Sequence, residues 1–184
     1  MIIFTDGACK GNGKKTAKAS WAFYDNNKLI KRGLVNPFEY KLLDGNNLQV
    51  TDISINPSNN RGELLAVIFA LLYINECGNI TEYNVIYSDS LITVNTINIW
   101  YNNRKKKGTL HEFKNLDLIN IIMELFNKFI NTKCEHVLAH RKYSKNFSED
   151  EEMLWNGNNI VDKYATELLN SVQNNTTEYE EILI

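Results

Sequence analysis

The sequence predicts an α/β protein in which a mixed sheet is flanked by helices. Three short strand-like segments come first, and helical and strand-like segments then alternate along the chain. Two apolar runs end on a hydroxyl residue followed by a carboxylate, Ile3-Phe4-Thr5-Asp6 and Ile86-Tyr87-Ser88-Asp89. Such runs fill the middle of a sheet that is buried on both faces. Because a buried carboxylate is costly without a partner, two of them at strand ends indicate a shared divalent cation.

Five strands are expected, over residues 1–6, 19–24, 29–35, 83–88 and 134–139. A loop rich in glycine and lysine is expected from Asp6 to Lys18, and Asp25-Asn26-Asn27 is expected to form the next turn. Residues 36–57 hold both prolines and an Asp44-Gly45-Asn46-Asn47 turn, which favours an irregular segment or an extended hairpin.

The strongest helix signal covers residues 60–76, with Asn60 as the expected N-cap and Gly78 after the end. Its apolar run, Leu64 to Ile74, is too short to span a membrane and indicates a buried helix. Further helices are expected over residues 90–100, 111–131 and 158–172, with a long polar loop over 140–156. Residues 173–184 are acidic and polar, so we expect a frayed tail after a single domain of residues 1–172.

Composition limits the class of protein. The chain has 184 residues, of which 43% are hydrophobic and 23% charged, as in an ordinary globular domain. The cysteines Cys9, Cys77 and Cys134 are widely spaced and odd in number, which disfavours a disulfide framework or a zinc site. No charged leader precedes the first strand, so we do not expect a signal peptide. We expect an intracellular location, in the cytoplasm or the nucleus.

The formal net charge of −2 argues mildly against binding to nucleic acid, but the charges are clustered. Acidic residues gather at 148–152 and 178–181. Bound divalent ions would reverse the sign of the local charge at an acidic site. Basic residues gather in two places: Lys10, Lys14, Lys15 and Lys18, and Arg104-Lys105-Lys106-Lys107.

Four sequence blocks, in order, carry a family resemblance. They are Phe4-Thr5-Asp6-Gly7 with Gly11-Asn12-Gly13; Asn59-Asn60-Arg61-Gly62-Glu63-Leu64; Tyr87-Ser88-Asp89-Ser90 with Trp100; and Gly157-Asn158 with Val161-Asp162 and Ala165. On these blocks the chain resembles type 1 ribonuclease H, a family that cuts the RNA strand of RNA–DNA hybrids. The resemblance spans residues 1 to about 172 and implies the ribonuclease H-like fold, a five-stranded mixed sheet flanked by helices.

The resemblance also implies a site and a mechanism. Asp6, Glu63, Asp89 and Asp162 would hold two Mg²⁺ or Mn²⁺ ions, one activating a water and the other stabilising the leaving 3′-oxygen. Hydrolysis would leave 5′-phosphate and 3′-hydroxyl ends. His140 matches a mobile histidine that shuttles a proton and aids product release, whereas His111 and His136 match no motif and are interpreted as structural.

Substrate contacts are implied in the same way. Asn12, Asn59 and Asn60 would read 2′-hydroxyls and base edges, for which an amide both donates and accepts hydrogen bonds. Ser58 and Asn115 would grip a DNA phosphate, and Trp100 would form the wall of the DNA channel. The basic turn of Arg104, Lys105, Lys106 and Lys107 would add phosphate contacts that carry no sequence preference.

Each residue also has a simpler interpretation. Asp6-Gly7 alone is typical of a turn, Glu63 could complete a capping box with Asn60, and Asp89-Ser90 could cap a helix. Asp162 could sit in the first turn of its helix, where the helix dipole favours it. Trp100 could be a core residue, His140 an exposed loop residue, and the basic turn a solvated helix end.

Rival functions remain open at this point. They are a catalytically silent hybrid-binding module, another nuclease or strand-transfer enzyme of the same superfamily acting on DNA, and a structural interaction protein. The presence of all four acids argues against the first, and Asn59-Asn60-Arg61 with the basic turn argues against the second. The third leaves the buried acids unexplained. We expect a monomer that acts on a hybrid and not on a membrane.

The chain also departs from the family pattern. Asn159 stands where an acid is common, and Ala139 replaces a glycine before the histidine. The loop after His140 and the segment of residues 36–57 are both longer than the family pattern leads us to expect.

Overall fold

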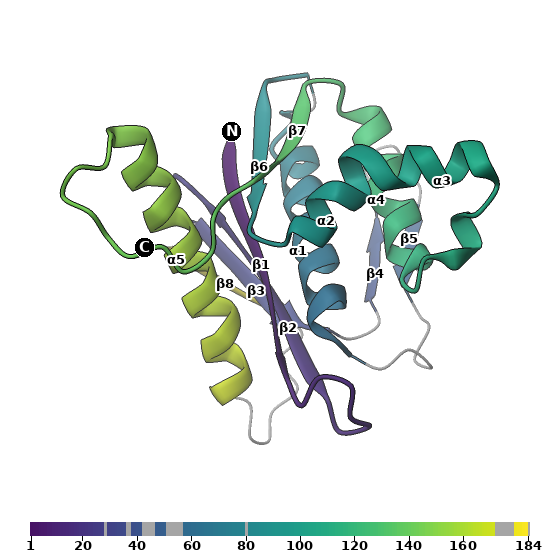
Figure 1. The fold of residues 1–184 in the computed structure, drawn as a ribbon, viewed down its shortest axis with the longest axis horizontal. Coiled ribbons are helices and arrows are strands. Elements are labelled where there is room, and N and C mark those ends of the chain that lie inside the picture. Colours follow the sequence, from purple (N-terminus) through teal and green to yellow (C-terminus); the bar gives the residue numbers. More distant parts are fainter. Residues whose placement is uncertain are drawn as a thin grey trace.

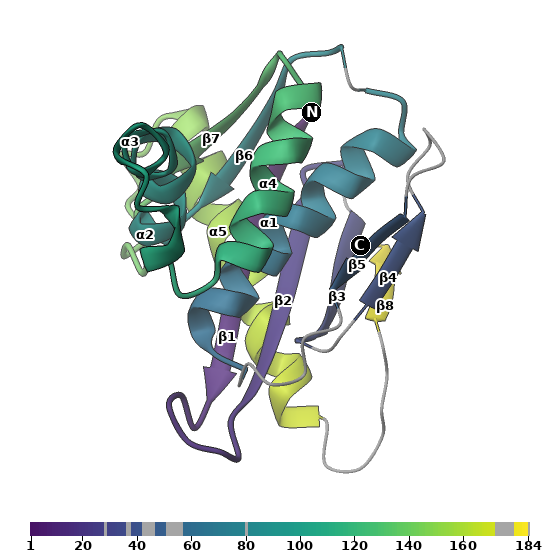
Figure 2. The same cartoon turned by 90° about the vertical axis from the view of Figure 1, so that its right-hand side faces the viewer.

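A mixed six-stranded sheet forms the centre of the protein, in the strand order β7-β6-β1-β2-β3-β8 (Figure 1). The computed structural model describes residues 1–27, 29–35, 38–41, 47–50, 57–79, 81–171 and 179–183. The strands of this sheet are β1 (Ile2–Lys10), β2 (Lys18–Asp25), β3 (Leu29–Leu34), β6 (Asn84–Ser88), β7 (Thr132–His136) and β8 (Tyr179–Leu183). Strands β4 (Phe38–Lys41) and β5 (Asn47–Val50) form a separate antiparallel pair, seen at the side of the molecule in Figure 2.

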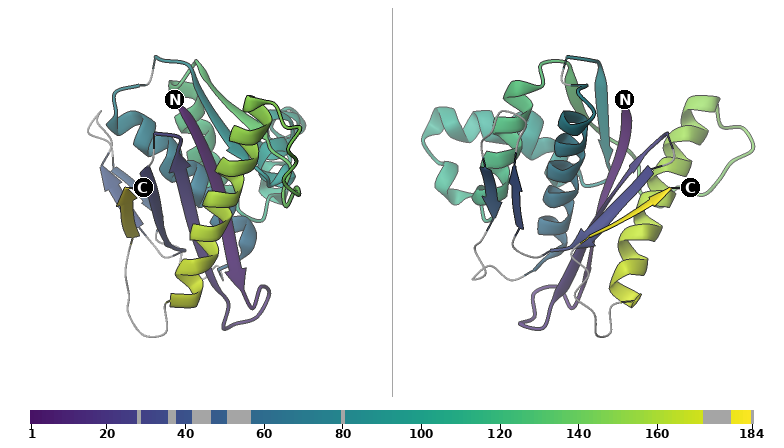
Figure 3. Two further views of the ribbon diagram at one scale, coloured as in Figure 1. Left: turned by 90° about the vertical axis from the view of Figure 1, so that its left-hand side faces the viewer. Right: turned by 180° about the vertical axis from the view of Figure 1, so that it is seen from behind.

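The helices lie on both faces of the sheet. Helices α1 (Asn59–Glu76) and α4 (Leu116–Lys128) cover one face, and α5 (Glu149–Ser171) covers the other (Figures 1 and 3). Helix α2 (Leu91–Asn95) follows β6 and continues through a π-helix (Thr96–Trp100) into α3 (Tyr101–Lys107), which projects from the body. A short 3₁₀ turn (Leu110–Glu112) leads to α4.

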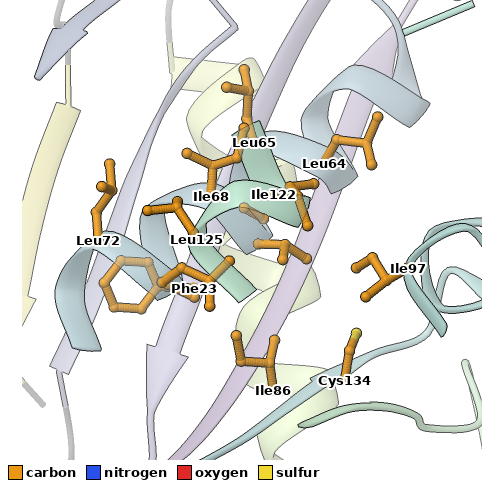
Figure 4. Close-up of a cluster of buried hydrophobic side chains, with 14 of the residues drawn as sticks. Phe23, Leu64, Leu65, Ile68, Leu72, Ile86, Ile97, Ile122, Leu125 and Cys134 are labelled. Carbon is orange, nitrogen blue, oxygen red and sulfur yellow. The ribbon is translucent and has the colours of Figure 1, made fainter. Parts of the chain in front are cut away.

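Alternation along the strands creates two cores. In β1 and β2, Ile3 and Phe23 point toward α1 and α4, while Phe4 and Tyr24 point toward α5. The larger core lies between the sheet, α1 and α4, and includes Leu65, Ile68, Ile86, Ile122 and Leu125 (Figure 4). Helix α1 is buried along most of its length, as its apolar sequence predicts. None of the described helices is long and apolar enough to cross a membrane.

The register of the central strands sets up the site. Strand β1 pairs in parallel with β6, and Thr5 lies opposite Ser88. Because these are the last paired residues, Asp6 and Asp89 follow them side by side at the point where the two strands separate.

The predicted fold class is confirmed, but several details differ. The sheet has a sixth strand, because residues 179–183 form β8 where a frayed tail was expected. Strand β8 pairs with β3 in an antiparallel ladder, and two ion pairs accompany it: Arg32 contacts Glu180 at 2.7 Å and Lys31 contacts Glu181 at 3.2 Å. Strand β1 also continues through Asp6 to Lys10 in a ladder with β2, so the predicted loop shrinks to residues 11–17.

The helix boundaries differ as well. Helix α5 begins at Glu149 inside the predicted polar loop, and β7 ends at His136, before the predicted Ala139. The helix expected over residues 111–131 begins only at Leu116, and the helix expected to end at Trp100 continues to Lys107. The expected hairpin within residues 36–57 is present as β4 and β5; its Asp44-Gly45-Asn46 turn lies outside the described residues.

Candidate active site

Carboxylates from separate elements converge beside the end of the β1–β6 pairing. Asp6 lies within β1, Glu63 in the first turns of α1, Asp89 directly after β6, and Asp162 in the middle of α5. One carboxylate oxygen of each of Asp6, Glu63 and Asp89 lies within 4.8 Å of the others. Asp162 is close enough to act electrostatically on both aspartates. The four predicted acids therefore meet at one place.

A close approach of two glycines places Glu63 beside Asp6. A Cβ atom on Gly7 would lie 2.2 Å from the backbone nitrogen of Glu63, and one on Gly62 would lie 2.4 Å from the carbonyl oxygen of Ser20. No side chain fits at either position without moving the backbone. The absence of both side chains lets the start of α1 touch β1 and β2 directly.

Another glycine brings in Asp162. A Cβ atom on Gly157 would lie 2.3 Å from the ring of Phe4, so α5 can pack tightly on β1 only with glycine at this position. Five residues further along α5, Asp162 lines the pocket with the other acids. The side chain of Asn158, which is 4% exposed, lies close enough to Asp89 to favour the ionised form of that carboxyl. Asn158, Asp162 and the pocket residue Thr166 are spaced four residues apart and so share one face of the helix.

Burial and mutual repulsion disfavour ionisation of Asp6, Glu63 and Asp89 in the metal-free protein. Burial, with the charges of Asp89 and Asp162, raises the pKa of Asp6 to about 8. Burial and the charges of Asp6 and Asp89 also raise the pKa of Glu63 well above its usual value. Burial raises the pKa of Asp89 too, although the neighbouring Asn158 side chain and the charge of His140 oppose that rise. A cation at this point would remove the repulsion.

The donor atoms present fit a hard divalent cation. Asn59 donates to one oxygen of Glu63 at 3.3 Å, while the other, Oε2, is buried and accepts no hydrogen bond from the described residues. An orphaned carboxylate oxygen in a cluster of carboxylates is the arrangement that Mg²⁺, Mn²⁺ or Ca²⁺ completes. Asp6, Glu63, Asp89 and Asp162 are therefore the residues that could hold a metal.

An open pocket of about 540 Å³ surrounds the acids. The four acids line it together with His140, Asn59 and Asn60, so these predicted site residues are brought together. His140 is exposed and sits in the loop after β7 with a φ of 49°. Sequence reasoning did not select the other lining residues, which are Gly7, Ala8, Cys9, Ser90, Leu91, Ile92, Ala139 and Thr166.

The sequence motif around Gly157 contains Asn158 but does not predict that it lies beside the acids. The four-residue spacing from Asn158 to Asp162 was the signal that could have found its position. Leu91 and Ile92 had an equally simple signal, because they directly follow Asp89-Ser90.

Ser58 and Asn115 do not line the pocket and lie where α1 and α4 begin. Ser58 caps α1 by accepting a hydrogen bond from the backbone N–H of Arg61, which replaces the predicted Asn60 cap. The buried guanidinium of Arg61 donates to Asn115 at 3.4 Å and to both oxygens of Asp117, the shorter contact being 2.7 Å. Arg61 thus ties together the N-termini of α1 and α4, whose dipoles and unpaired amides favour anions.

The remaining predicted contact residues lie outside the pocket. Asn12 is exposed in the β1–β2 hairpin, and Trp100 is 39% exposed at the end of the π-helix. In α3, Arg104 contacts Glu112 at 3.4 Å and lies over the Phe113 ring, whereas Lys105, Lys106 and Lys107 are exposed.

The structure decides against several simpler interpretations. Glu63 completes no capping box with Asn60, because the cap is Ser58. Asp162 lies far beyond the first turn of α5, so the helix dipole does not explain it. Ser90 is the residue that caps α2, not Asp89, and Trp100 is too exposed to be a core residue.

The fold and the acidic pocket together define an α/β protein with a candidate metal-dependent site. The chain belongs to the RNase H family, whose family model, described as RNase H, matches residues 1–170. A protein named Ribonuclease H from Caldicellulosiruptor saccharolyticus is 33% identical over 156 residues, covering 82% of this chain and 91% of its own length.

Solved structures show the same fold. LC9-RNase H1, described as a type 1 RNase H with the type 2 active-site motif, superposes with a TM-score of 0.62 at 16% identity, covering 96% of this chain and 73% of its own. A foamy viral protease-reverse transcriptase in complex with an RNA/DNA hybrid has a TM-score of 0.56 at 15% identity, covering 90% of this chain and 19% of its own.

Proposed function

We propose that this protein is an endonuclease that hydrolyses the RNA strand of RNA–DNA hybrids and leaves 5′-phosphate and 3′-hydroxyl ends. The observation that carries the proposal is the convergence of Asp6, Glu63, Asp89 and Asp162 in one open pocket. Membership of the RNase H family and a relative named Ribonuclease H support it.

Asp6, Glu63, Asp89 and Asp162 would hold two divalent ions, Mg²⁺ or alternatively Mn²⁺. When bound, such ions activate a water molecule and stabilise the departing 3′-oxygen. The chain itself supplies rigid placement, because Asp6 stands on β1, Glu63 on α1 and Asp162 on α5, and Asp89 directly follows β6. Asn59 donates a hydrogen bond to Glu63, and the buried side chain of Asn158 lies beside Asp89 and favours its ionised form.

His140 would carry protons at the open side of this pocket. It lines the same cavity as the acids and is exposed, so its imidazole can exchange protons with solvent. It would assist release of the cleaved strand and would not act as a metal ligand.

Recognition of the hybrid would use two kinds of contact. Asn59 and Asn60 line the pocket beside the acids, and with Asn12 they would contact 2′-hydroxyls and base edges. The paired helix N-termini at Ser58 and Asn115 would bind a phosphate of the DNA strand. Trp100 would form the wall of the DNA channel, and Arg104, Lys105, Lys106 and Lys107 would bind backbone phosphates.

We further propose that residues 1–172 carry the catalytic machinery, with β8 completing the sheet, and that the protein acts as a monomer inside the cell. The described cysteines are all unpaired, in keeping with a reducing environment.

The test is incubation of the protein with a labelled RNA–DNA hybrid, double-stranded RNA and double-stranded DNA, with and without Mg²⁺. We expect cleavage of the RNA strand of the hybrid only, dependent on Mg²⁺, and its loss in Asp89→Asn. Asp150→Asn changes an exposed carboxylate of α5 outside the pocket and should cleave normally. Binding without cleavage would instead indicate a silent module, and equal cleavage of DNA would indicate a DNA nuclease.

A further inference from the structure

The loop of residues 137–148 joins β7 to α5 (Figure 1). It carries His140, which lines the pocket. Among the described residues, His140 is the only non-glycine residue with a positive φ, at 49°. A side chain with a Cβ atom rarely adopts this left-handed conformation, and it persists only where the surroundings enforce it. Contacts that hold the neighbouring backbone therefore determine how His140 is presented.

One such contact reaches the residue directly after His140. The indole Nε1–H of Trp155, in the first turns of α5, donates to the carbonyl oxygen of Arg141 at 2.7 Å. No other hydrogen bond to the backbone of residues 138–143 is found in the described part of the chain. The side chain of Arg141 is held as well, since it donates to Glu151 at 3.3 Å and lies 4.6 Å from the centre of the Phe147 ring.

Aromatic packing surrounds this hydrogen bond. The Tyr143 ring centre lies 5.2 Å from that of Trp155 and 5.8 Å from that of Phe147, which it meets edge-on. A capping box then closes the loop, because Ser148 Oγ accepts from the Glu151 backbone N–H while the Ser148 N–H donates to the Glu151 carboxylate. The loop therefore has a small packed cluster of its own, built on the start of α5.

We propose that Trp155 is a positioning residue whose indole N–H, through the Arg141 carbonyl, fixes the backbone that presents His140 to the carboxylate pocket. The inference rests on the proposed role of His140. Trp155 itself does not line the pocket, so it acts only through the loop.

The test variant is Trp155→Phe, which keeps an aromatic ring in the cluster and removes the donor. The first measurement needs neither metal nor substrate: limited trypsin digestion in EDTA, with fragments identified by mass. Arg141, Lys142 and Lys145 are exposed trypsin sites within the loop. Because a hydrogen bond of this kind contributes on the order of 1 kcal/mol, cleavage at these sites should accelerate about three- to tenfold in Trp155→Phe. An unchanged rate would overturn the proposal.

The second measurement is a kinetic double-mutant cycle with His140→Ala on the RNA–DNA hybrid. Trp155→Phe should lower kcat about three- to tenfold, the kinetic equivalent of one such hydrogen bond, while KM changes less than about twofold. In the His140→Ala background the same substitution should have no further effect on kcat, because the residue that it positions is absent. Equal effects in both backgrounds would refute positioning and would show a general structural loss.

A matched control separates the hydrogen bond from the aromatic cluster. Tyr143→Phe removes a hydroxyl for which no hydrogen bond is found among the described residues, and it should leave trypsin sensitivity and kcat at wild-type values. If His140→Ala leaves kcat unchanged, the role of His140 fails and the inference fails with it. If His140→Ala lowers kcat but Trp155→Phe does not, only the positioning inference fails.

Discussion

The metal-free protein should lose stability as the pH rises from 5 to 8. Burial and neighbouring carboxylates raise the pKa of Asp6 from 3.8 to about 8, and they raise that of Glu63 as well. Within this pH range the folded protein keeps protons that the unfolded chain releases. The unfolded state is therefore favoured increasingly with each step up in pH, and the loss is complete only once the pH passes the raised pKa values.

The size of the effect follows from the number of protons. One proton held only by the folded state lowers the free energy of unfolding by about 1.4 kcal/mol per pH unit. For Asp6 alone this amounts to about 4 kcal/mol between pH 5 and 8, somewhat less as its own titration begins. Retained protonation of Glu63 would add to the slope. A change of this size is a large share of the roughly 5–15 kcal/mol that stabilises a domain.

The assay is urea unfolding followed by circular dichroism at several pH values, in EDTA and in excess Mg²⁺. In EDTA the free energy of unfolding should fall with pH, and Asp6→Asn should flatten the dependence. Mg²⁺ binds the ionised acids, so it should stabilise the folded protein most at high pH. Asp150→Asn, outside the pocket, should keep the wild-type slope. Stability in EDTA that is constant or rises over this range would refute the assignment of raised pKa values to the acidic pocket.

Three further outcomes are expected. Changing the three lysines 105–107 to Ala should reduce the slope of log binding constant against log salt concentration by up to about 2.7 for the hybrid, with little effect on kcat. An unaltered slope would show that these lysines are only a solvated surface. His140→Ala should lower kcat roughly ten- to a thousandfold, and Mg²⁺ binding measured by calorimetry should remain. If this variant keeps the wild-type kcat across pH 6 to 9, His140 is only an exposed loop residue. Gly157→Ala should lower the free energy of unfolding by about 2 kcal/mol, measured by urea unfolding, because the new Cβ atom would clash with Phe4. This loss is expected even though Ala normally favours a helix over Gly. Adding Phe4→Leu should recover part of the lost stability.

The acidic site was predictable because each acid stands in a local motif. Two apolar strands that both lead to a carboxylate also indicated the adjacency of Asp6 and Asp89, which the parallel pairing of β1 and β6 produces. The continuation of β1 to Lys10 was missed, because the local Gly-rich sequence favours a loop and only pairing with β2 overrides it.

The start of α5 was misplaced for a different reason. The run Asn156-Gly157-Asn158 favours a break, but Gly157 serves close packing against Phe4 rather than a turn. The capping box formed by Ser148 and Glu151 is the sequence signal that marks the true start of the helix.

Strand β8 could not be predicted from local pattern at all. Its acidic residues pair with Arg32 and Lys31, about 150 positions away, and no short window contains both partners.

The four acids stand on β1, on α1, directly after β6 and on α5, and this distribution has a consequence for how the protein opens. Any partial unfolding that detaches one of these elements also dismantles the metal centre, so a bound ion disfavours every such opening. Hydrogen exchange of amides in β1, α1, β6 and α5 should therefore slow together on addition of Mg²⁺. By contrast, β8 lies at the edge of the sheet and carries none of the acids. Those of its amides that exchange by local opening should exchange at the same rate with and without Mg²⁺.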